Sequence, residues 1–429
     1  MKKNDKVNVF WFRRDLRLND NIGLCEALKG DNPVLPVFIF DTDITDDLPV
    51  DDARIGFIYD QLVEIDNKLR ESGGGVLCLK GKTKEVWTEI LDSYDVKQVF
   101  CNEDYEPYAI VRDKDFAKWF EEKGVKMHLF KDQVIFAKDE IMKEDGSPYT
   151  VFTPYKKQWV KKFEALPQAS IAKPKLKNFI GADFQFPTLK KLGFKESDIK
   201  ARDYNISDLD NYAEDRSFPA RDKSSYLSVH LRFGTVSIRE IVEQTKTNEV
   251  FLSELIWREF FMQILYNFPK VVTDNFKPKY DNLKWRNDED EFEKWKKGET
   301  GYPLVDAGMR ELNATGYLSN RVRLVVAGFL CKHLLIDWRW GEAYFAEKLL
   351  DYELSSNNGN WQWCAGTGSD AAPYFRLFNP TTQAKKFDPQ NEYISKWIPS
   401  LDPSEYPEPM VDHKEARERA LFAYKVASE

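Results

Sequence analysis

The sequence predicts three successive parts: an α/β domain on a five-stranded parallel sheet, a long connector, and an all-α domain. In residues 1–130, short apolar runs alternate with amphipathic helical patterns, which is typical of consecutive βα units. In residues 131–205, proline, lysine and aromatic residues are frequent and the periodicity is weak. In residues 206–429, helical patterns follow one another and are separated by prolines.

The elements of the α/β part follow from its apolar runs. The predicted strands are 7–12, 34–40, 76–79, 99–102 and 125–129, and the predicted helices are 21–28, 53–71, 83–94 and 110–123. This alternation predicts a parallel, Rossmann-like sheet with right-handed crossovers. No glycine fingerprint for a dinucleotide follows the first strand, which runs instead into the charged residues 13–17.

The rest of the chain is predicted more coarsely. We expect the connector to cross between the domains without regular structure, although such a long loop is unusual in a compact protein. In the all-α part we expect helices at 325–335 and at 413–427, among others.

Composition excludes several classes of protein. The 429 residues hold only four histidines against twelve tryptophans, which disfavours a metal site or a histidine-based catalytic triad. The five cysteines are odd in number and widely spaced, so we expect reduced thiols in the cytoplasm. No apolar run is long enough to cross a membrane, and we find no secretory signal. The net charge of −8 argues against indiscriminate nucleic-acid binding by the whole surface.

Residues 351–383 (DYELSSNNGNWQWCAGTGSDAAPYFRLFNPTTQ) are the most unusual stretch. Small residues beside Trp361 and Trp363 suggest a backbone packed against a flat aromatic body. Asn357, Asn358 and Asn360 offer donors and acceptors that suit the polar edge of a heterocycle. The alternative is an irregular, tryptophan-anchored loop of a helical domain.

This stretch closely resembles the flavin-binding region of the DNA photolyase/cryptochrome family. The resemblance covers nearly the whole chain, because residues 9–17 (VFWFRRDLR), 254–260 (ELIWREF) and 406–409 (YPEP) also match in order. The chain looks most like a class I cyclobutane pyrimidine dimer photolyase. The resemblance implies that the all-α part is a catalytic domain that binds flavin adenine dinucleotide (FAD).

The resemblance also assigns residues to the cofactor. The serines before a predicted helix would hold the FAD diphosphate, although from the residues alone they read equally as an N-cap. Arg323 and Asp351 would flank the isoalloxazine as a pair, and Asn357 would face flavin N5. The full set of expected FAD contacts is Tyr212, Ser224, Ser225, Leu227, Ser228, Phe251, Glu254, Arg323, Asp351, Glu353 and Asn357.

Other residues are expected at the substrate. Glu254, Trp257 and Arg258 share one helical face by their spacing, although an amphipathic helix with one buried tryptophan gives the same pattern. By resemblance, Glu254 bonds the damaged bases, Trp257 stacks on a flipped pyrimidine, and Asn320 contacts base or flavin. Glu254, Trp257, Asn320 and Asn357 form the expected catalytic set, and the expected DNA contacts are Arg216, Trp257, Arg258, Arg321, Trp363 and Arg376.

Three tryptophans complete the expected site. Trp361, Trp338 and Trp285 match positions that form a chain of rings from the flavin to the surface in the family. Indoles are easily oxidised, so such a chain relays electrons to the flavin, with Trp285 outermost. From the sequence alone each of the three reads equally as a core residue.

The resemblance implies light-dependent repair of cyclobutane pyrimidine dimers in UV-damaged DNA, by electron transfer from excited reduced FAD to a flipped-out dimer. Two alternatives are a cryptochrome-type blue-light photoreceptor that binds FAD without repair, and a plain nucleotide-binding α/β module with a helical partner domain. Asn320 and Leu324 replace the histidines of (6-4) photolyases, so we expect no (6-4) repair. Leu324 also replaces a methionine common in the best-matching class, a swap that conserves volume.

The sequence specifies a second chromophore, the light-harvesting antenna, less closely than any other feature. Ala109 stands where the folate-binding type carries a glutamate, and residues 101–108 (CNEDYEPY) resemble the flavin or deazaflavin type, or members without an antenna. From the residues alone, the same stretch is a strand end with a turn. We expect a cytoplasmic monomer that binds UV-damaged duplex and single-stranded DNA, without a metal and without a membrane anchor.

Overall fold

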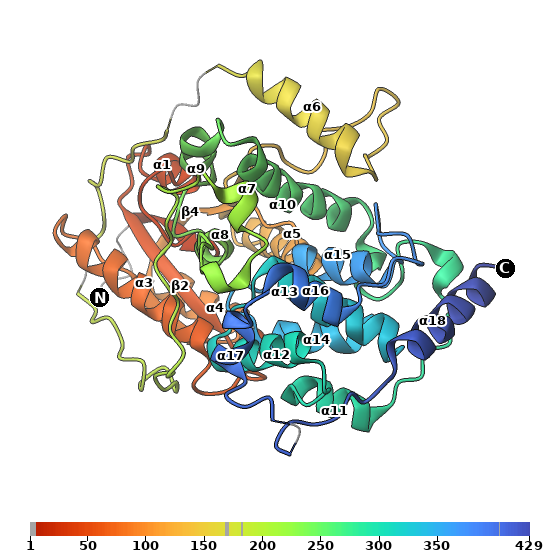
Figure 1. The fold of residues 1–429 in the computed structure, drawn as a ribbon. Helices are drawn as coiled ribbons and strands as arrows, with labels where there is room; N and C mark the ends of the chain where they lie inside the picture. Colours follow the sequence, from red (N-terminus) through yellow and green to blue (C-terminus); the bar gives the residue numbers. More distant parts are fainter. Residues whose placement is uncertain (1–5, 168–170, 182, 403) are drawn as a thin grey trace. The chain divides into compact units, whose positions relative to one another are not determined.

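The computed structural model describes residues 6–167, 171–181, 183–402 and 404–429. By contacts, the chain divides into two units, each of which gathers separate stretches of sequence. The first unit comprises Met1–Ala137, Ala165–Asp203 and Leu227–Thr245, and the second comprises Lys138–Glu164, Tyr204–Tyr226 and Lys246–Glu429. Figure 1 follows the chain through both units by colour.

The first unit is built on a parallel sheet in the order β3-β2-β1-β4-β5, which confirms the predicted fold class (Figure 1). Its strands are β1 (Lys6–Phe12), β2 (Val34–Asp41), β3 (Leu77–Gly81), β4 (Asp95–Asn102) and β5 (Lys126–Phe130). Every residue of β2 is buried, as expected for strands covered on both faces. Because the chain leaves β1 toward β2 and later returns to pair β4 with β1, the strand order reverses between β1 and β4.

Seven helices of the described residues belong to the first unit. They are α1 (Ile22–Ala27), α2 (Thr42–Thr45), α3 (Ala53–Arg70), α4 (Thr83–Ser93), α5 (Pro107–Glu121), α8 (Leu227–Phe233) and α9 (Ile238–Thr245). Helix α5 begins three residues before its predicted start, because Pro107 occupies a first-turn position that suits its fixed φ angle. On one side of the sheet, Trp11 packs edge-on against Trp87 and Phe116.

The predicted connector contains a helix that the sequence analysis missed, α6 (Phe152–Glu164). Phe152, Tyr155 and Trp159 are its buried residues, and this spacing gives one apolar stripe. Helix α6 belongs to the second unit, whereas Ala165–Asp203 belongs to the first. Helices α8 and α9 also belong to the first unit, although they follow residue 206. The domain boundaries at 130 and 205 therefore stay predictions, and the contact units divide the chain differently.

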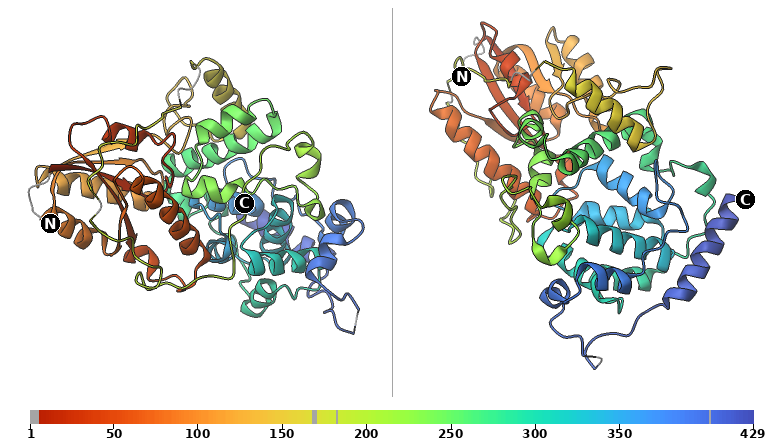
Figure 2. Two further views of the ribbon diagram at one scale, coloured as in Figure 1. Left: turned by 90° about the vertical axis from the view of Figure 1, so that its left-hand side faces the viewer. Right: turned by 45° about the horizontal axis from the view of Figure 1, so that its top comes forward.

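The second unit is helical (Figures 1 and 2). Besides α6 it contains α7 (Tyr212–Asp215), η1 (Pro219–Arg221), α10 (Glu249–Asn267), η2 (Pro269–Val272), η3 (Pro278–Tyr280), α11 (Glu289–Lys297), α12 (Pro303–Thr315), α13 (Asn320–Gly328), η4 (Phe329–His333), α14 (Trp338–Lys348), α15 (Leu354–Ala365), α16 (Pro380–Phe387), α17 (Glu392–Trp397) and α18 (His413–Ser428). Its largest core cluster joins α11 to α15 and includes Trp295, Trp338 and Trp361.

The stretch around Trp361 is a regular helix, α15, so the alternative of an irregular loop is wrong. Glu353 accepts hydrogen bonds from the backbone N–H groups of Ser355 and Ser356 at its start, as an N-cap does. Gly366 ends the helix at a φ of 85°, a conformation that glycine adopts without strain. The apolar period is hidden because Asn357, Asn358 and Gln362 are among the buried residues.

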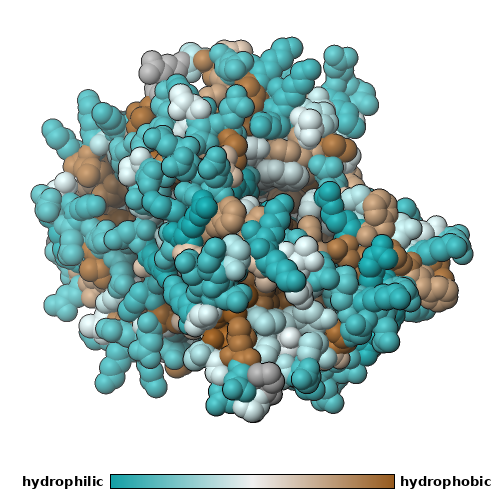
Figure 3. All heavy atoms as spheres, in the orientation of Figure 1, coloured by the Kyte–Doolittle hydropathy of each residue, from teal (hydrophilic) through white to brown (hydrophobic). Residues whose placement is uncertain are grey.

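The described residues contain no helix that is long and apolar enough to span a membrane. Hydrophilic residues cover most of the face shown in Figure 3, with hydrophobic residues in small groups between them. In the described part of the chain, no three His, Cys, Asp or Glu side chains gather as a metal site would require.

Candidate functional site

Helix α10 carries the acidic residue and the aromatic ring that the sequence placed on one face. Glu254 forms an ion pair of 2.6 Å with Arg216, and both side chains are partly exposed. Tyr212 lies beside this pair, with its ring edge against Phe251 at 5.0 Å between centroids. Burial, together with the nearby Glu254 carboxylate, raises the pKa of Tyr212 to about 12. The tyrosine is therefore a neutral hydrogen-bonding group at neutral pH.

The indole of Trp257 contacts two other rings. Phe152 stacks on it with centroids 3.6 Å apart and planes 6° apart, and Phe261 lies at 5.4 Å and 29°. A Cβ atom at Gly359 of α15 would lie 2.2 Å from the ring of Phe261, so only glycine permits this approach of α15 to α10. The sequence analysis missed Phe152, because nothing local in the sequence links it to Trp257.

Asn357 lies on α15 with its amide orientation fixed. Its Nδ2 donates to the backbone oxygen of Glu342 at 3.0 Å and to Oε1 of the same residue at 2.8 Å. Burial raises the pKa of Glu342. Because the amide donor is engaged, Oδ1 is the group left to accept a hydrogen bond, and none of the described residues donates to it. Glu342 has no sequence signal and was not predicted.

The other amides of α15 have hydrogen-bond partners within the protein. Asn358 donates to the backbone oxygen of Val271 at 2.8 Å, and Gln362 donates to the same oxygen at 2.9 Å. Asn360 donates to the oxygen of Ser356 within its own helix. The amide of Asn358 therefore ties α15 to the backbone of η2, whereas Asn360 is exposed and bonds within its own helix. Their interpretation as a polar edge for a ligand stays a prediction.

The predicted pair of Arg323 and Asp351 is present. Their nitrogen and oxygen atoms lie 2.9 Å apart, with the arginine side chain 30% exposed and the aspartate 7%. Arg323 also donates to the backbone oxygen of Leu318 at 2.8 Å, which fixes its guanidinium. Glu353 is committed to the start of α15, where its carboxylate also accepts from the hydroxyl of Ser355.

Helix α13 begins at Asn320, five residues before its predicted start, so Asn320, Arg321 and Arg323 form its first turn. Asn320 is exposed. The guanidinium of Arg321 lies 4.1 Å from the ring centroid of Phe387 and donates to the hydroxyl of Ser217 at 3.3 Å. Burial and the nearby Arg216 lower the pKa of Arg321. Two cations thus raise the potential of this region for anions.

The three expected electron-transfer tryptophans lie in the second unit, and Trp285 is the most exposed of them. Trp361 and Trp338 are buried, and Trp285 is half-buried. Trp361 packs edge-on against Phe345 at 4.9 Å and fits over Gly341 of α14, where a Cβ would lie 2.1 Å from the indole. The indole nitrogen of Trp338 donates to Asn275 at 2.9 Å. A role in electron transfer stays a prediction.

The remaining predicted residues lie on helix starts and loops. Ser224 and Ser225 precede α8, and Leu227 and Ser228 are the first residues of that helix. Ser224 and Ser225 belong to the second unit, whereas Leu227 and Ser228 belong to the first. Arg258 and Trp363 are partly exposed, and Arg376 is exposed in the loop after α15. Their expected roles toward FAD and DNA stay predictions.

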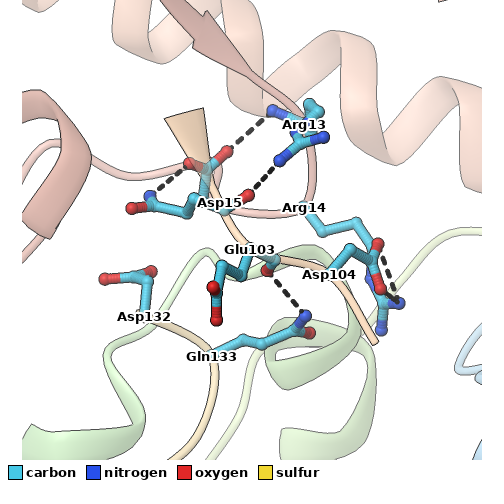
Figure 4. A pocket seen from close by; sticks show the side chains of 8 residues that line it. Arg13, Arg14, Asp15, Glu103, Asp104, Asp132 and Gln133 are labelled. Carbon is cyan, nitrogen blue, oxygen red and sulfur yellow. Dashed lines mark hydrogen bonds and ion pairs between the residues drawn. The ribbon is translucent and has the colours of Figure 1, made fainter. Parts of the chain in front are cut away.

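A small charged pocket, with room for about one water molecule, lies in the first unit where β1 and β4 end (Figure 4). Several of its polar side chains are paired. Asn102 donates to Asp15 at 2.6 Å, Arg14 binds Asp104 at 3.1 Å, and Arg13 binds Asp113, which lies outside the lining. Burial raises the pKa of Asp15. The lining residues all carry charged or amide side chains.

With this geometry in place, comparisons with known proteins decide the family. Residues 8–175 match the model of DNA photolyase, and residues 251–405 match that of the FAD binding domain of DNA photolyase. A deoxyribodipyrimidine photo-lyase of Halobacterium salinarum is 34% identical, over 98% of this chain and 99% of the relative. The chain belongs to the DNA photolyase family.

Solved photolyase structures share the fold. A class III photolyase from Agrobacterium tumefaciens superposes with a TM-score of 0.88 at 31% identity, covering 100% of this chain and 98% of that one. A photolyase from Sulfolobus tokodaii that contains two FAD molecules has a TM-score of 0.84 at 34% identity, covering 98% and 100%. Several curated relatives are named deoxyribodipyrimidine photo-lyase.

The FAD-binding domain lies within the second unit, and its residues fit a flavin nucleotide. Asn357 presents a carbonyl oxygen as an acceptor, because Glu342 holds its N–H₂ group. Arg323 and Asp351 offer an oriented cation and anion, which can bond the polar edges of a flat ring system. The prediction of FAD as the cofactor is thus confirmed for the domain, while the contact of each residue stays a prediction.

Proposed function

We propose that this protein repairs cyclobutane pyrimidine dimers in UV-damaged DNA with blue light. Its relatives in the family are named for photo-lyase activity. The observation that carries the proposal is that α10, which carries Glu254 and Trp257, packs against α15, which carries Asn357. When bound, reduced FAD supplies the light absorption and the electron for the reaction.

The residues of the second unit would bind and orient the damaged bases. A dimer stacks poorly, so flipping it out of the duplex costs less than flipping an intact base. Trp257 offers a flat surface, and such stacking contributes about 1–3 kcal/mol per base. Glu254, held by Arg216 at 2.6 Å, would bond the polar edge of the flipped bases. Arg258, Arg321 and Arg376 would bind phosphates, so affinity should fall with salt.

Three tryptophans would supply electrons that keep the flavin reduced. Their exposure, from buried Trp361 and Trp338 to half-buried Trp285, supports a path that ends near solvent. We also propose a cytoplasmic monomer of class I that acts on duplex and single-stranded DNA, with a flavin- or deazaflavin-type antenna or none.

The decisive experiment measures recovery of intact thymines from a dimer-bearing oligonucleotide under blue light, with the flavin chemically reduced beforehand. Light-dependent recovery, absent in the dark, is expected. Absence of recovery by protein that holds reduced FAD would reject repair and favour the photoreceptor alternative. Purified protein that is colourless and releases no flavin on denaturation would reject both and leave a plain nucleotide-binding module.

A further inference from the structure

We propose that Phe152, held in place by Asp370, is a positioning residue that sets the plane of the Trp257 indole for stacking on a flipped pyrimidine. The inference rests on the proposed function, because it assigns the substrate-stacking role to Trp257. All three residues belong to the second unit. They come from three separate elements: the start of α6, the loop after α15, and the middle of α10.

The stack of Phe152 on Trp257 is nearly parallel. The centroids are 3.6 Å apart and the planes differ by 6°, whereas aromatic pairs in proteins more often meet edge-to-face or offset at 4.5–7 Å. Phe152 is buried, and Phe260 meets it edge-on at 5.8 Å. Trp257 is only partly buried. A buried ring on one face therefore fixes the plane of an indole that keeps exposed surface.

Phe152 is also fixed through its backbone. It is the first residue of α6, where backbone N–H groups have no partner within the helix, and its N–H donates to the carboxylate of Asp370 at 3.1 Å. A carboxylate also suits the positive end of the helix dipole. Asp370 thus acts as an N-terminal cap for α6 although it lies 218 residues away in the chain.

Asp370 adopts a backbone conformation that a residue with a side chain rarely takes. Its φ of +49° lies in the left-handed region, which costs free energy for any residue except glycine and is best tolerated by Asn and Asp. The preceding residue makes a second tie, because the hydroxyl of Ser369 donates to the backbone oxygen of Thr150 at 2.6 Å. The loop that carries exposed Arg376 is thereby joined to the start of α6.

Other contacts join α6 to α10 without Trp257. Tyr155 packs on Phe260 at 5.3 Å, and the indole nitrogen of Trp159 donates to Glu259 at 2.6 Å. Phe163 stacks on Trp159 at 5.0 Å. Helix α6 therefore keeps its attachment to α10 when Phe152 is changed, and Phe163 provides a matched stack on the same helix that does not touch the substrate surface.

The test compares Phe152→Leu with Phe163→Leu in the full protein containing FAD. Dissociation constants are measured for one oligonucleotide with and without a thymine dimer. Stacking on aromatic rings changes affinity by roughly 5- to 150-fold per base, so we expect Phe152→Leu to lose about fivefold or more in dimer affinity. Affinity for undamaged DNA, FAD content and light-driven flavin reduction should stay unchanged. Phe163→Leu should leave the dimer preference intact.

A second pair of variants tests the role of Asp370 without backbone strain. Asp370→Gly accepts the left-handed φ but loses the carboxylate, whereas Asp370→Asn keeps an acceptor oxygen and tolerates the same φ. We expect Asp370→Gly to lower dimer preference about two- to fivefold, and Asp370→Asn to restore it.

The outcomes separate this inference from the proposed function. If the wild-type protein repairs dimers and both Phe152→Leu and Asp370→Gly keep the full dimer preference, the inference is wrong and repair stands. Equal losses for dimer-bearing and undamaged DNA would also overturn it, because that result indicates a general structural role. A wild-type protein that shows no dimer preference would reject the function, independently of either variant.

Discussion

The two units contain charged clusters of opposite character. In the first unit, Asp132 lies between Arg17 at 2.7 Å and Arg239 at 2.8 Å, and its side chain is 1% exposed. In the second unit, the pair of Arg216 and Glu254 leaves 22% and 35% of its side chains exposed. Both clusters are ion pairs with short distances, so pairing alone does not distinguish a structural cluster from a binding site.

The difference lies in what each cluster can still do. Arg17 and Arg239 also bind the backbone oxygen of Asp20, so the buried network of the first unit is directed at the protein itself. Glu254 retains exposed surface, and Asn357 retains an acceptor oxygen once Glu342 has engaged its N–H₂ group. We therefore expect changes in the first network to lower stability, and changes in the second cluster to lower activity.

The largest expected effect is the loss of light-driven flavin reduction when Trp361 is replaced, without a change in repair. Trp361→Phe should abolish light-driven flavin reduction, because a phenyl ring is much harder to oxidise than an indole, while repair by chemically reduced protein persists. Flavin absorbance under blue light with an external reductant measures light-driven flavin reduction. Dimer repair by the chemically reduced protein is measured separately. Loss of both activities would show that Trp361 is mainly structural, a role that agrees with its exposed fraction of only 2%.

The largest expected effect on stability is in the first unit. Asp132→Asn should lower the free energy of unfolding by about 3–5 kcal/mol, because it leaves buried Arg17 without its ion-pair partner and Arg239 with the carboxylate of Asp20 alone. Urea unfolding measures the loss, and Asp51→Asn, at an exposed position, is the control. A loss below about 1 kcal/mol would place this network among ordinary surface pairs.

The same aspartate predicts a pH dependence. Burial alone would raise the pKa of Asp132, but Arg17 and Arg239 lower it on balance. Its stabilisation is therefore complete above the unfolded pKa of about 3.9 and is lost as the pH falls through the lower folded pKa. The stability difference between wild type and Asp132→Asn should shrink in acid.

The second unit also contains a buried ionisable side chain, Lys332, which can be compared with the buried Asp132 of the first unit. Its Nζ donates to the backbone oxygen of Ala365 at 2.6 Å and lies 3.7 Å from the ring centroid of Tyr424. Burial lowers the pKa of Lys332 to about 7 from 10.5. Between these values the unfolded chain holds a proton that the folded protein lacks, so stability should rise with pH relative to Lys332→Met, by up to ~1.4 kcal/mol per unit. The free energies of unfolding of wild type and Lys332→Met are measured by urea unfolding at several pH values. The same pH dependence in both proteins would contradict this prediction.

The smallest expected effect is the stability cost of the exposed pair. Arg216→Gln should change the free energy of unfolding by at most about 1 kcal/mol, yet it should weaken binding of dimer-bearing DNA, because Glu254 loses its oriented partner. Chemical unfolding measures the free energy of unfolding, and titration with dimer-bearing DNA measures the affinity. A large stability loss with unchanged DNA affinity would reverse the assignment of the two clusters.

The sequence predicted the sheet well because β1 and β2 are mostly apolar and buried, whereas β4 begins four residues before its predicted start because its first half is largely polar. It placed Glu254, Trp257 and Asn357 through long motifs that resemble a known family. It did not predict α15 as a helix, because buried amides replace the apolar stripe, and it did not predict α6 within the connector. Phe152, Asp370 and Glu342 were missed for a physical reason: each acts through a partner distant in the chain, and no local pattern records such a contact.

The most direct test of the account measures repair yield per absorbed photon for Glu254→Ala and wild type, both holding chemically reduced FAD. The account predicts a lower yield for the variant at saturating dimer, with its FAD content unchanged and its stability within about 1 kcal/mol of wild type. Equal yields in the two proteins would contradict the central claim that the exposed carboxylate on α10 faces the damaged bases.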